Sequence, residues 1–328
     1  MKVSEQYIVN VSSINDFMQC RFRWICKWVE NRVPRDTARP LQFGKLQHKL
    51  FEYHQALPGM PMAEAIAKVR REWEAEKEHV TVDTPEWQIV RDALDDLAQM
   101  EEPLLQWRDR YPFDVPVLEV EEPFIYTWPG DESIVLRGRP DRAGVLFGEV
   151  FHVQNRTLAS AVNFPLYIEG EKRSYHEHLY AEHLNRKYGE NRKYGGTLYN
   201  LYRKLKYRKK ATKAQVEKNL PGDILHDVSE LFWQHPMRID LDSDLHRHVM
   251  DSIYNHVVEM RHTETVYRQF MRIPPPNEKL NKGPYGNSID PYYRVLTGEI
   301  QLSDDTYFKN REETYAEVGT ESDGPTRD

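Results

Sequence analysis

Three polar side chains alternate with apolar residues in one short segment, and an aspartate precedes them. His152, Gln154 and Arg156 lie two residues apart in this segment. On a β-strand, residues at that spacing point to one face, so an imidazole, an amide and a guanidinium would stand together. Asp141 offers a hard oxygen ligand to a divalent cation, and a guanidinium binds phosphate through paired hydrogen bonds. The spacing therefore predicts a strand face that carries three polar side chains beside an aspartate.

Each of these residues also has a structural interpretation. Gln154 and Arg156 could form a hydrogen-bonded pair at the end of a sheet, and Asp141 follows a proline, where turn residues are common. His48, four residues before Glu52 on an expected helix, could be an ordinary surface or core histidine. The choice between these interpretations depends on whether the residues meet in space.

The composition is that of a soluble globular protein. Of the 328 residues, 39% are hydrophobic and 30% are charged, which excludes a largely disordered chain. No apolar run approaches the roughly 20 residues that cross a bilayer, and residues 1–13 lack the apolar region of a signal peptide. We therefore expect a cytoplasmic protein that does not bind a membrane. With only Cys20 and Cys26, neither a disulfide framework nor a four-thiolate metal site is expected.

The charges are unevenly distributed. The net charge is −7, yet residues 183–213 contain eleven Lys and Arg residues against Glu190 alone. Tyrosines are interleaved with the basic residues, a composition that suits phosphate contacts and base stacking. A solvated charged edge is the alternative. The residues expected to bind nucleic acid are Tyr199, Tyr202, Arg203, Lys204, Lys206, Arg208, Lys209 and Lys210.

Hydrophobic periodicity divides the chain into a helical first third, a strand-rich middle and a helical last third. A capping box at Ser13 predicts the start of the first helix. Further helices are expected at 62–79, 85–111, 174–189 and 242–270, and strands at 115–128, 134–141 and 148–157. Residues 196–208 fit a strand better than a short helix. The three strands of the middle region are expected to pair antiparallel.

These elements suggest four regions along the chain. We expect a helical N-terminal lobe at 1–114, a core of sheet and helix at 115–213, a helical C-terminal extension at 214–318 and a disordered tail at 319–328. His176, His178 and His183 lie on one expected helix, but their spacings of two and five do not share a face well. They are therefore expected to be solvated rather than to form a metal cluster.

The order of these motifs resembles the RecB-type branch of the PD-(D/E)XK nuclease superfamily, in a phage-like form. The resemblance rests on the helix beginning "VSSINDFMQC", on "GKLQH" with Gly44 and His48, on "GRPD" ending at Asp141, and on the strand ending "QNRT". It covers roughly residues 11–204. Family members with an iron–sulfur cluster use one early and three late cysteines, so no cluster is expected in this chain.

The resemblance implies roles for individual residues. His48 and Asp141 correspond to metal ligands, Gln154 stands where the family has a second acidic ligand, and Arg156 stands where it has a lysine. His152 lies beside them and is a further candidate ligand. The minor candidates are Glu121, His176 and Tyr180, the last two matching a Gln…Tyr signature in which His replaces Gln.

The resemblance implies an α/β fold with a mixed central sheet flanked by helices, and cleavage of DNA with Mg²⁺ or Mn²⁺. The imidazoles favour Mn²⁺, because nitrogen ligands suit transition ions better than Mg²⁺. Exonuclease action on a single strand or a duplex end is expected, in recombination, repair or genome processing in a bacterial or phage-infected cell, with a possible recombination partner protein. The alternatives are a weakened or inactive DNA-binding or assembly subunit, which the residues at 154 and 156 favour, and a helical interaction protein that binds no nucleic acid.

Overall fold

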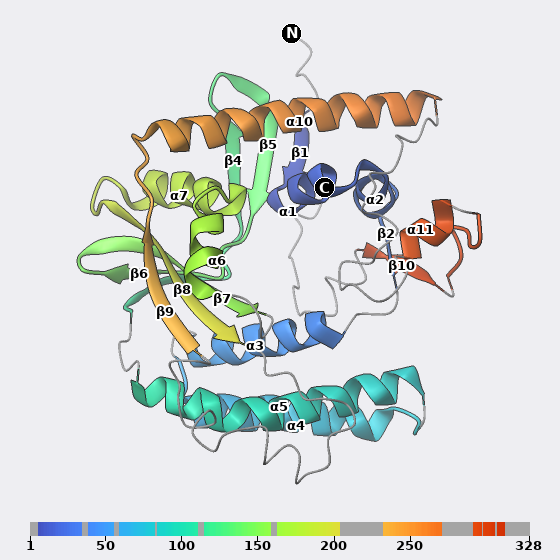
Figure 1. Ribbon diagram of the computed structural model, residues 1–328, viewed down its shortest axis with the longest axis vertical. Helices are drawn as coiled ribbons and strands as arrows, with labels where there is room; N and C mark the ends of the chain where they lie inside the picture. The colour runs from blue at the N-terminus through green and yellow to red at the C-terminus, as the bar shows by residue number, and fades with distance from the viewer. Residues whose placement is uncertain are drawn as a thin grey trace, which may run out of the picture. The chain divides into compact units, whose positions relative to one another are not determined.

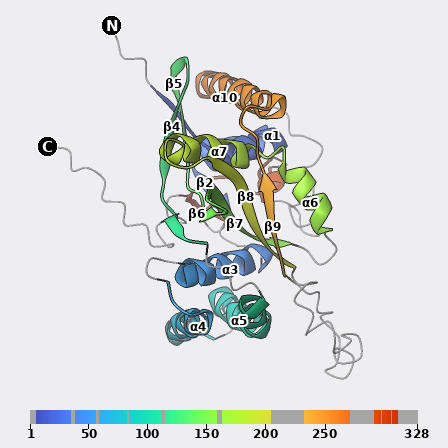
Figure 2. The same cartoon turned by 90° about the vertical axis from the view of Figure 1, so that its left-hand side faces the viewer.

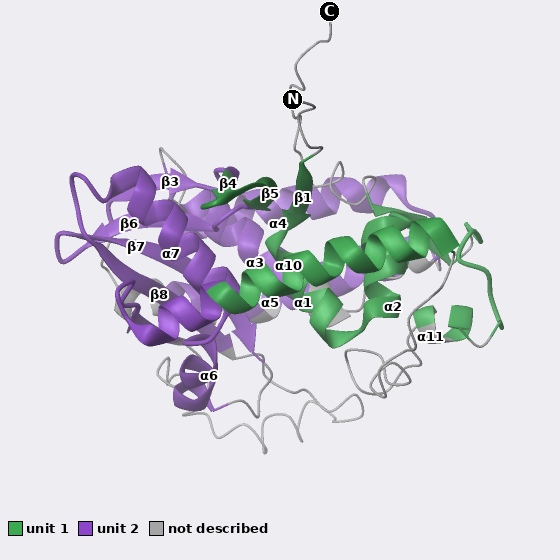
Figure 3. Cartoon of the chain, turned by 90° about the horizontal axis from the view of Figure 1, so that it is seen from above, with its two compact units in different colours: residues 1–38, 125–137, 251–328 green, residues 39–124, 138–250 purple. Residues whose placement is uncertain are grey.

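The computed structural model describes residues 6–34, 39–55, 59–82, 84–110, 115–158, 163–203, 232–270, 291–296, 298–305 and 307–311. The chain forms two compact units, each assembled from separate stretches of sequence. Unit 1 comprises Met1–Ala38, Ile125–Arg137 and Asp251–Asp328, and unit 2 comprises Arg39–Phe124 and Gly138–Met250 (Figure 3). The four regions expected from the sequence follow the chain in order, whereas these units interleave along it.

Unit 1 contains a three-stranded sheet and a two-stranded sheet. The first has the order β1-β5-β4, with β1 parallel to β5, and in the second β10 pairs antiparallel with β2. The elements that lie wholly or largely in this unit are β1 (Tyr7–Asn10), α1 (Val11–Gln19), α2 (Arg21–Trp24), η1 (Ile25–Val29), β2 (Arg32–Pro34), β4 (Phe124–Trp128), β5 (Asp131–Gly138), α10 (Asp244–Phe270), α11 (Pro291–Leu296) and β10 (Phe308–Asn310).

The first helix begins earlier than the capping box predicts. α1 starts at Val11, after Asn10 in extended conformation, and the Ser13 hydroxyl donates to the Asn10 carbonyl at 2.7 Å. Ser13 is therefore inside the first turn rather than at its cap. The helix is interrupted at Cys20, whose backbone is extended, before α2 and the π-helical turn η1 continue the segment.

Unit 2 contains a five-stranded mixed sheet with the order β3-β6-β7-β8-β9. β3, β6 and β7 pair antiparallel, β7 and β8 pair parallel, and β8 and β9 pair antiparallel. Its elements are β3 (Val117–Val120), β6 (Arg142–Leu146), β7 (Glu149–Leu158), β8 (Tyr194–Arg203), β9 (Phe232–Arg238), α3 (Arg39–Gln55), α4 (Met62–His79), α5 (Pro85–Arg110), α6 (Phe164–Glu171) and α7 (Tyr175–Tyr188). The expected α/β class with a mixed, helix-flanked sheet is confirmed.

The parallel pair β7 and β8 requires a crossover, which α6 and α7 provide (Figure 1). α7 contacts β7 and β8, and its buried residues Ala181 and Leu184, three positions apart on one side of the helix, join the apolar core formed with these strands. This apolar stripe packs α7 against the sheet face that carries the even-numbered residues of β7. The crossover therefore covers the predicted polar face with a helix.

The opposite sheet face meets α3. Thr157 Oγ1 on β7 donates to Gln47 of α3, and Tyr202 of β8 stacks on Phe43 with ring centroids 5.7 Å apart. Figure 2 shows α3 next to the sheet, with α4 and α5 beyond it. Leu46 and Leu50 of α3 join the core that these helices share. α3 is thus fixed by apolar packing on both sides, which holds His48 in place.

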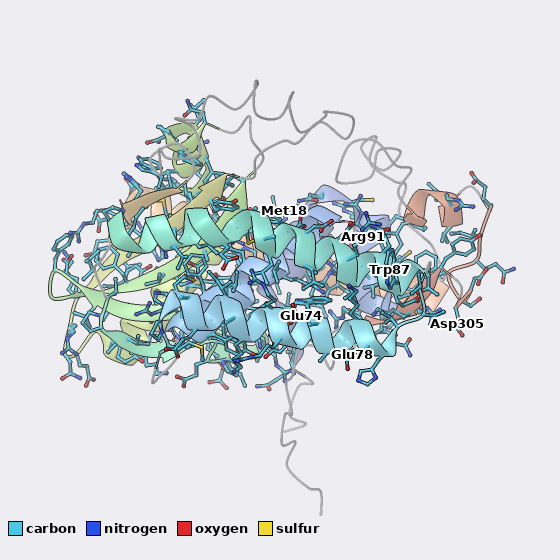
Figure 4. The ribbon with its side chains drawn as sticks, turned by 90° about the horizontal axis from the view of Figure 1, so that it is seen from below. Met18, Glu74, Glu78, Trp87, Arg91 and Asp305 are labelled. Atoms are coloured by element: carbon cyan, nitrogen blue, oxygen red, sulfur yellow. The ribbon has the colours of Figure 1, made fainter. Side chains whose placement is uncertain are left out.

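α4 and α5 lie side by side and carry charged groups at their exposed positions. Glu74 and Glu78 of α4 are exposed, as is Arg91 of α5, whose guanidinium lies over the Trp87 ring at 5.4 Å (Figure 4). The boundaries expected for both helices are confirmed at 62–79 and, within one residue, at 85–110.

Three features of the strand region differ from expectation. The single strand expected at 115–128 is two strands, β3 and β4, which belong to different sheets. Glu121 lies between them with a φ of 49°, a left-handed conformation that breaks the extended run. The strand expected at 134–141 is β5, which lies in the sheet with β1 and β4 and does not join β7 in one antiparallel group. Neither β6 nor β9 was expected, although β9 pairs with β8 throughout its own length. The helix expected at 174–189 is confirmed as α7, and the strand expected at 196–208 is confirmed as β8, which begins two residues earlier, at Tyr194.

Candidate metal and phosphate site

Three potential metal ligands from separate elements of unit 2 converge. Ligand atoms of His48, Glu121 and Asp141 all lie within 4.8 Å of one another. His48 Nδ1 is 3.5 Å from Asp141 Oδ2, and both side chains are partly exposed. His48 comes from α3, Glu121 follows β3, and Asp141 precedes β6. The structure brings together His48 and Asp141, two of the ligands that the resemblance implies, and Glu121 lies with them.

Asp141 is tied by hydrogen bonds to the strands on both sides of it. The Glu121 amide donates to the Asp141 carbonyl at 3.1 Å, and the Asn155 amide donates to Asp141 Oδ2 at 3.2 Å. The first bond links Asp141 to the end of β3, and the second links its carboxylate to β7. These bonds set the Asp141 carboxylate beside the strand that carries Gln154 and Arg156.

The turn before Asp141 depends on close packing at Gly138. A Cβ atom there would lie 2.5 Å from Phe124 and 2.9 Å from Tyr180, distances too short for any side chain. The Tyr180 hydroxyl donates at 3.2 Å to the carbonyl of Arg139, the residue that follows Gly138 in this turn. Tyr180, a minor candidate from the sequence, is therefore buried against the turn that presents Asp141.

Glu121 has a strained backbone and a perturbed carboxyl group. Burial and the nearby Asp141 carboxylate raise the pKa of Glu121 to about 7, although Arg139 Nε lies 2.8 Å from Glu121 Oε2. Two carboxylates so close repel each other when both are ionised. A positive φ at a residue other than glycine costs free energy and is characteristic of functional positions. Both features fit a pair of acids arranged to share one cation.

The donor set fits a divalent cation. Carboxylate oxygens suit Mg²⁺ and Mn²⁺, and one imidazole nitrogen adds a ligand that transition ions bind better than Mg²⁺ does. A cation between Glu121 and Asp141 would relieve their repulsion, which adds to burial in raising the pKa of Glu121. The residues His48, Glu121 and Asp141 are therefore able to hold one ion.

The polar face of β7 has the predicted alignment. His152, Gln154 and Arg156 alternate along the strand, and their neighbours on β8 are Thr197, Tyr199 and Leu201. His152 and Gln154 are buried, whereas Arg156 is partly exposed at the end of the row. The face is thus open to solvent at Arg156 and closed at His152.

A carboxylate that the sequence analysis did not select lies under this face. Glu177 of α7 is fully buried, with His152 Nδ1 3.3 Å from its Oε2 and the Thr197 hydroxyl donating to the same oxygen. Burial alone would raise the pKa of Glu177, but the interactions with His152 and Thr197 outweigh it and hold the pKa at about 2. Glu177 is therefore ionised inside the protein at neutral pH.

Gln154 bridges this carboxylate and Arg156. A carboxylate only accepts hydrogen bonds, so the Gln154 nitrogen faces Glu177 Oε1 and its oxygen accepts from Arg156. Burial alone would lower the pKa of Arg156, but the surrounding acidic groups raise it above its ordinary value. The expected hydrogen-bonded pair of Gln154 and Arg156 is present, and it continues to a buried acid.

His152 and Gln154, which were expected as metal ligands, have protein partners of their own. His152 interacts with Glu177 and contacts the Tyr180 ring edge-on, with ring centroids 4.8 Å apart. The Gln154 amide is occupied on both sides by protein groups. His176 approaches the Tyr180 ring as well, with centroids 6.0 Å apart. The ligand role therefore fits Glu121 better than His152 or Gln154.

The base-stacking role expected for two tyrosines requires correction. Tyr199 is fully buried in the core under α6 and α7, and Tyr202 is buried against Phe43 of α3. β8 is an interior strand with helices on both faces, so neither ring is available to a base. The Arg203 side chain and the expected contacts Lys204, Lys206, Arg208, Lys209 and Lys210 lie outside the described residues.

The expected solvation of the α7 histidines also requires correction. His178 is buried, and its Nδ1 lies 2.8 Å from Nδ1 of His246, which is also buried. His183 stacks on Phe124, with ring centroids 4.2 Å apart. These histidines are held by packing and hydrogen bonds on the inner sides of the helix.

Glu177 had one detectable signal in the sequence. It precedes Ala181 by four residues and Leu184 by seven, so it lies on the apolar stripe of its helix. A charged residue in such a stripe must find a partner inside the protein. Periodicity alone does not identify that partner, because Gln154 and Thr197 come from other elements.

Comparison with known proteins supports a nuclease relationship for part of the chain. Residues 8–149 match the model of the PD-(D/E)XK nuclease superfamily. The match includes His48, Glu121 and Asp141 and ends before Gln154, Arg156 and Glu177. No curated protein matches the chain. Among the residues that the structure describes, none of the helices combines the length and apolar character needed to cross a membrane.

The fold and the match agree. PD-(D/E)XK nucleases use divalent metals, and the candidate metal ligands lie within the matched segment. The mixed sheet flanked by helices is consistent with a PD-(D/E)XK nuclease core, and residues 8–149 are similar to that superfamily of metal-dependent nucleases.

Proposed function

We propose that this protein is a divalent-metal-dependent deoxyribonuclease. The observation that carries the proposal is the convergence of His48, Glu121 and Asp141 within 4.8 Å, inside the segment that matches a nuclease superfamily. More specifically, the protein is proposed to be a RecB-type, phage-like exonuclease that acts on DNA during recombination, repair or genome processing. The setting, a bacterial or phage-infected cell, and a recombination partner protein rest on the resemblance alone.

Each site residue has a proposed role. His48, Glu121 and Asp141 hold the cation, which when bound would neutralise the scissile phosphate and lower the pKa of the attacking water. Arg156 binds the phosphate and stabilises the charge that develops during cleavage. Since a guanidinium stays protonated, Arg156 cannot take a proton from water. Its role is therefore electrostatic.

The ligand set favours Mn²⁺ over Mg²⁺. Mg²⁺ prefers all-oxygen octahedral coordination and is bound weakly when a ligand is nitrogen. His48 contributes an imidazole nitrogen, while Glu121 and Asp141 contribute oxygens. We expect cleavage with Mn²⁺ to exceed cleavage with Mg²⁺ at equal concentration.

A second candidate function is an inactive DNA-binding or assembly subunit. The observation that favours it is that the side chains at 154 and 156 are an amide and a guanidinium bonded to each other. Neither can act as a base, so proton transfer from water would depend on groups other than these. The basic residues Arg203, Lys204, Lys206, Arg208, Lys209 and Lys210 remain proposed DNA contacts under both functions.

Incubation with labelled DNA separates the two functions. The wild-type protein is incubated with single-stranded and duplex DNA in Mn²⁺, beside an Asp141→Ala variant whose melting temperature is compared with that of the wild type. Metal-dependent products from the wild type alone support the nuclease. DNA binding without products from either protein supports the subunit. If the wild-type protein neither binds nor cleaves DNA, both proposals are contradicted.

A further inference from the structure

Glu177 is enclosed by donors from the two central strands of the sheet. Its Oε2 accepts from Thr197 of β8 and interacts with His152 Nδ1 of β7, while its Oε1 accepts from the Gln154 amide. Its side chain is fully buried. Both oxygens are thus used by protein donors, and the carboxylate is anchored from three directions.

This arrangement fixes the orientation of Gln154. An amide has a donating side and an accepting side, and a carboxylate offers acceptors alone. Glu177 only accepts and Arg156 only donates, so both select the orientation in which the Gln154 oxygen points to Arg156. A neutral amide at 177 could donate or accept, so it would no longer hold the Gln154 nitrogen from that side.

Arg156, the residue proposed to bind phosphate, is the last member of this chain of contacts. The Gln154 oxygen accepts from Nη2 and from Nε of Arg156, the latter at 3.3 Å. Arginine has many rotamers, and holding one of them in advance lowers the cost of phosphate binding. The buried acid thereby influences a group that it does not touch in this chain of hydrogen bonds.

We propose that Glu177 is a positioning residue, which holds Arg156 in its phosphate-binding orientation through Gln154. Position 154 on β7 carries no acid. The buried carboxylate of Glu177 on α7 supplies the negative charge instead, and it reaches the Arg156 guanidinium through Gln154. This inference rests on the proposed function, because that function assigns phosphate binding to Arg156. The orientation itself can be measured without DNA.

Exchange of the Arg156 Nε proton with solvent is the direct readout. In ¹⁵N-arginine-labelled protein, the signal is assigned by its loss in Arg156→Lys. In Glu177→Gln we expect exchange to accelerate by about tenfold, because a charge-assisted network has been broken. Glu182→Gln is the matched control. Glu182 is on the same helix and interacts with His246 at 2.8 Å, away from Gln154, so exchange should stay at the wild-type rate.

Exchanging the two side chains tests the direction of the effect. In the double variant Gln154→Glu/Glu177→Gln, a carboxylate at 154 accepts from Arg156 and from the amide at 177. We expect this variant to restore slow exchange to within about threefold of wild type. A purely structural role for Glu177, as the partner of His152 and Thr197, would not be restored by moving the charge to position 154.

The outcomes separate this inference from the proposed function. Faster exchange in Glu177→Gln, with recovery in the double variant, supports the inference even if no DNA is cleaved. Wild-type exchange in a folded Glu177→Gln variant overturns it, even if the protein is an active nuclease. If Glu177→Gln does not fold, the double variant Gln154→Glu/Glu177→Gln is compared with Gln154→Leu, which leaves the Glu177 contacts with Thr197 and His152 in place: slow exchange in the double variant with fast exchange in Gln154→Leu supports the inference, and unchanged exchange in Gln154→Leu overturns it.

Discussion

The backbone amide of Glu121 donates to the carbonyl of Asp141 at 3.1 Å, and this bond joins the two acids of the candidate metal site. The residues are twenty positions apart and belong to different connections, one after β3 and one before β6. Antiparallel pairing of β3 with β6 brings those connections to the same end of the sheet. The acidic pair is therefore a consequence of strand register rather than of a contiguous motif.

Removing either acid should weaken metal binding. Glu121→Gln and Asp141→Asn each delete one charge from the ligand set, and we expect each to lower Mn²⁺ affinity at least about tenfold, measured by calorimetry. Glu122→Gln is the control, because Glu122 is exposed and pairs with Lys187 at 2.8 Å. Equal affinities for Glu121→Gln and Glu122→Gln would remove Glu121 from the site.

Arg156 should tolerate lysine but not glutamine. Arg156→Lys keeps the positive charge and adds an amine that can lose a proton, so cleavage should be retained or increased. Arg156→Gln removes the charge and should slow cleavage by about a hundredfold. The exposed Arg173, in the turn between α6 and α7, gives the control Arg173→Gln. Cleavage unaffected by Arg156→Gln would contradict the phosphate-binding role.

His176 should remain neutral well below neutral pH. Burial and the positive charge of Arg156 lower the pKa of His176 to about 4. A ¹⁵N NMR titration of the histidine side chains should therefore show one imidazole with a midpoint near that pH. In Arg156→Gln the repulsive charge is gone, so the midpoint should rise. A midpoint that is the same in both proteins would place Arg156 away from His176.

Glu177 should contribute to stability at neutral pH and lose that contribution in acid. Its pKa is about 2 in the folded protein, below the ordinary value of 4.5, so the ionised form stabilises the fold above that ordinary value. This stabilising contribution should fade as the pH drops from the ordinary pKa toward the pKa in the folded protein. Urea unfolding at several pH values should show a weaker acid dependence for Glu177→Gln than for Glu182→Gln. Parallel curves would contradict the ionised state.

Two glycines should respond in opposite ways to alanine. Gly138→Ala forces a methyl group against Phe124 and Tyr180 and should destabilise the protein by about 1–3 kcal/mol. At Gly44 on α3, an added Cβ atom would have no neighbouring atom within 4 Å, so Gly44→Ala should stabilise the protein by up to about 1 kcal/mol. Urea unfolding measures both. Equal effects would show that the turn before Asp141 is not closely packed.

The parts of the site that local rules govern were predictable from the sequence. Period-two spacing put His152, Gln154 and Arg156 on one face because the side-chain alternation of a strand does not depend on its partners. The meeting of His48 with Asp141 came from a resemblance in motif order. Glu121 was a minor candidate because a glutamate on a strand ordinarily faces solvent, and its left-handed φ is not visible in the sequence.

The remaining features depend on which elements pack together. Tyr199 and Tyr202 fit a nucleic-acid surface by composition, but the addition of β9 beyond β8 and helices on both faces made them core residues. The run expected as one strand was divided between two sheets at Glu121. Glu177 was missed because its partners come from β7 and β8, and helical periodicity carries no information on contacts across elements.

Anomalous scattering from a crystal soaked in Mn²⁺ would locate the ion that His48, Glu121 and Asp141 are proposed to hold. We expect a single strong peak bounded by the imidazole of His48 and the carboxylates of Glu121 and Asp141, with Gln154 still bonded to Arg156. A peak on His152 or Gln154 that leaves out Glu121, or no peak near Asp141 at a saturating Mn²⁺ concentration, would contradict it.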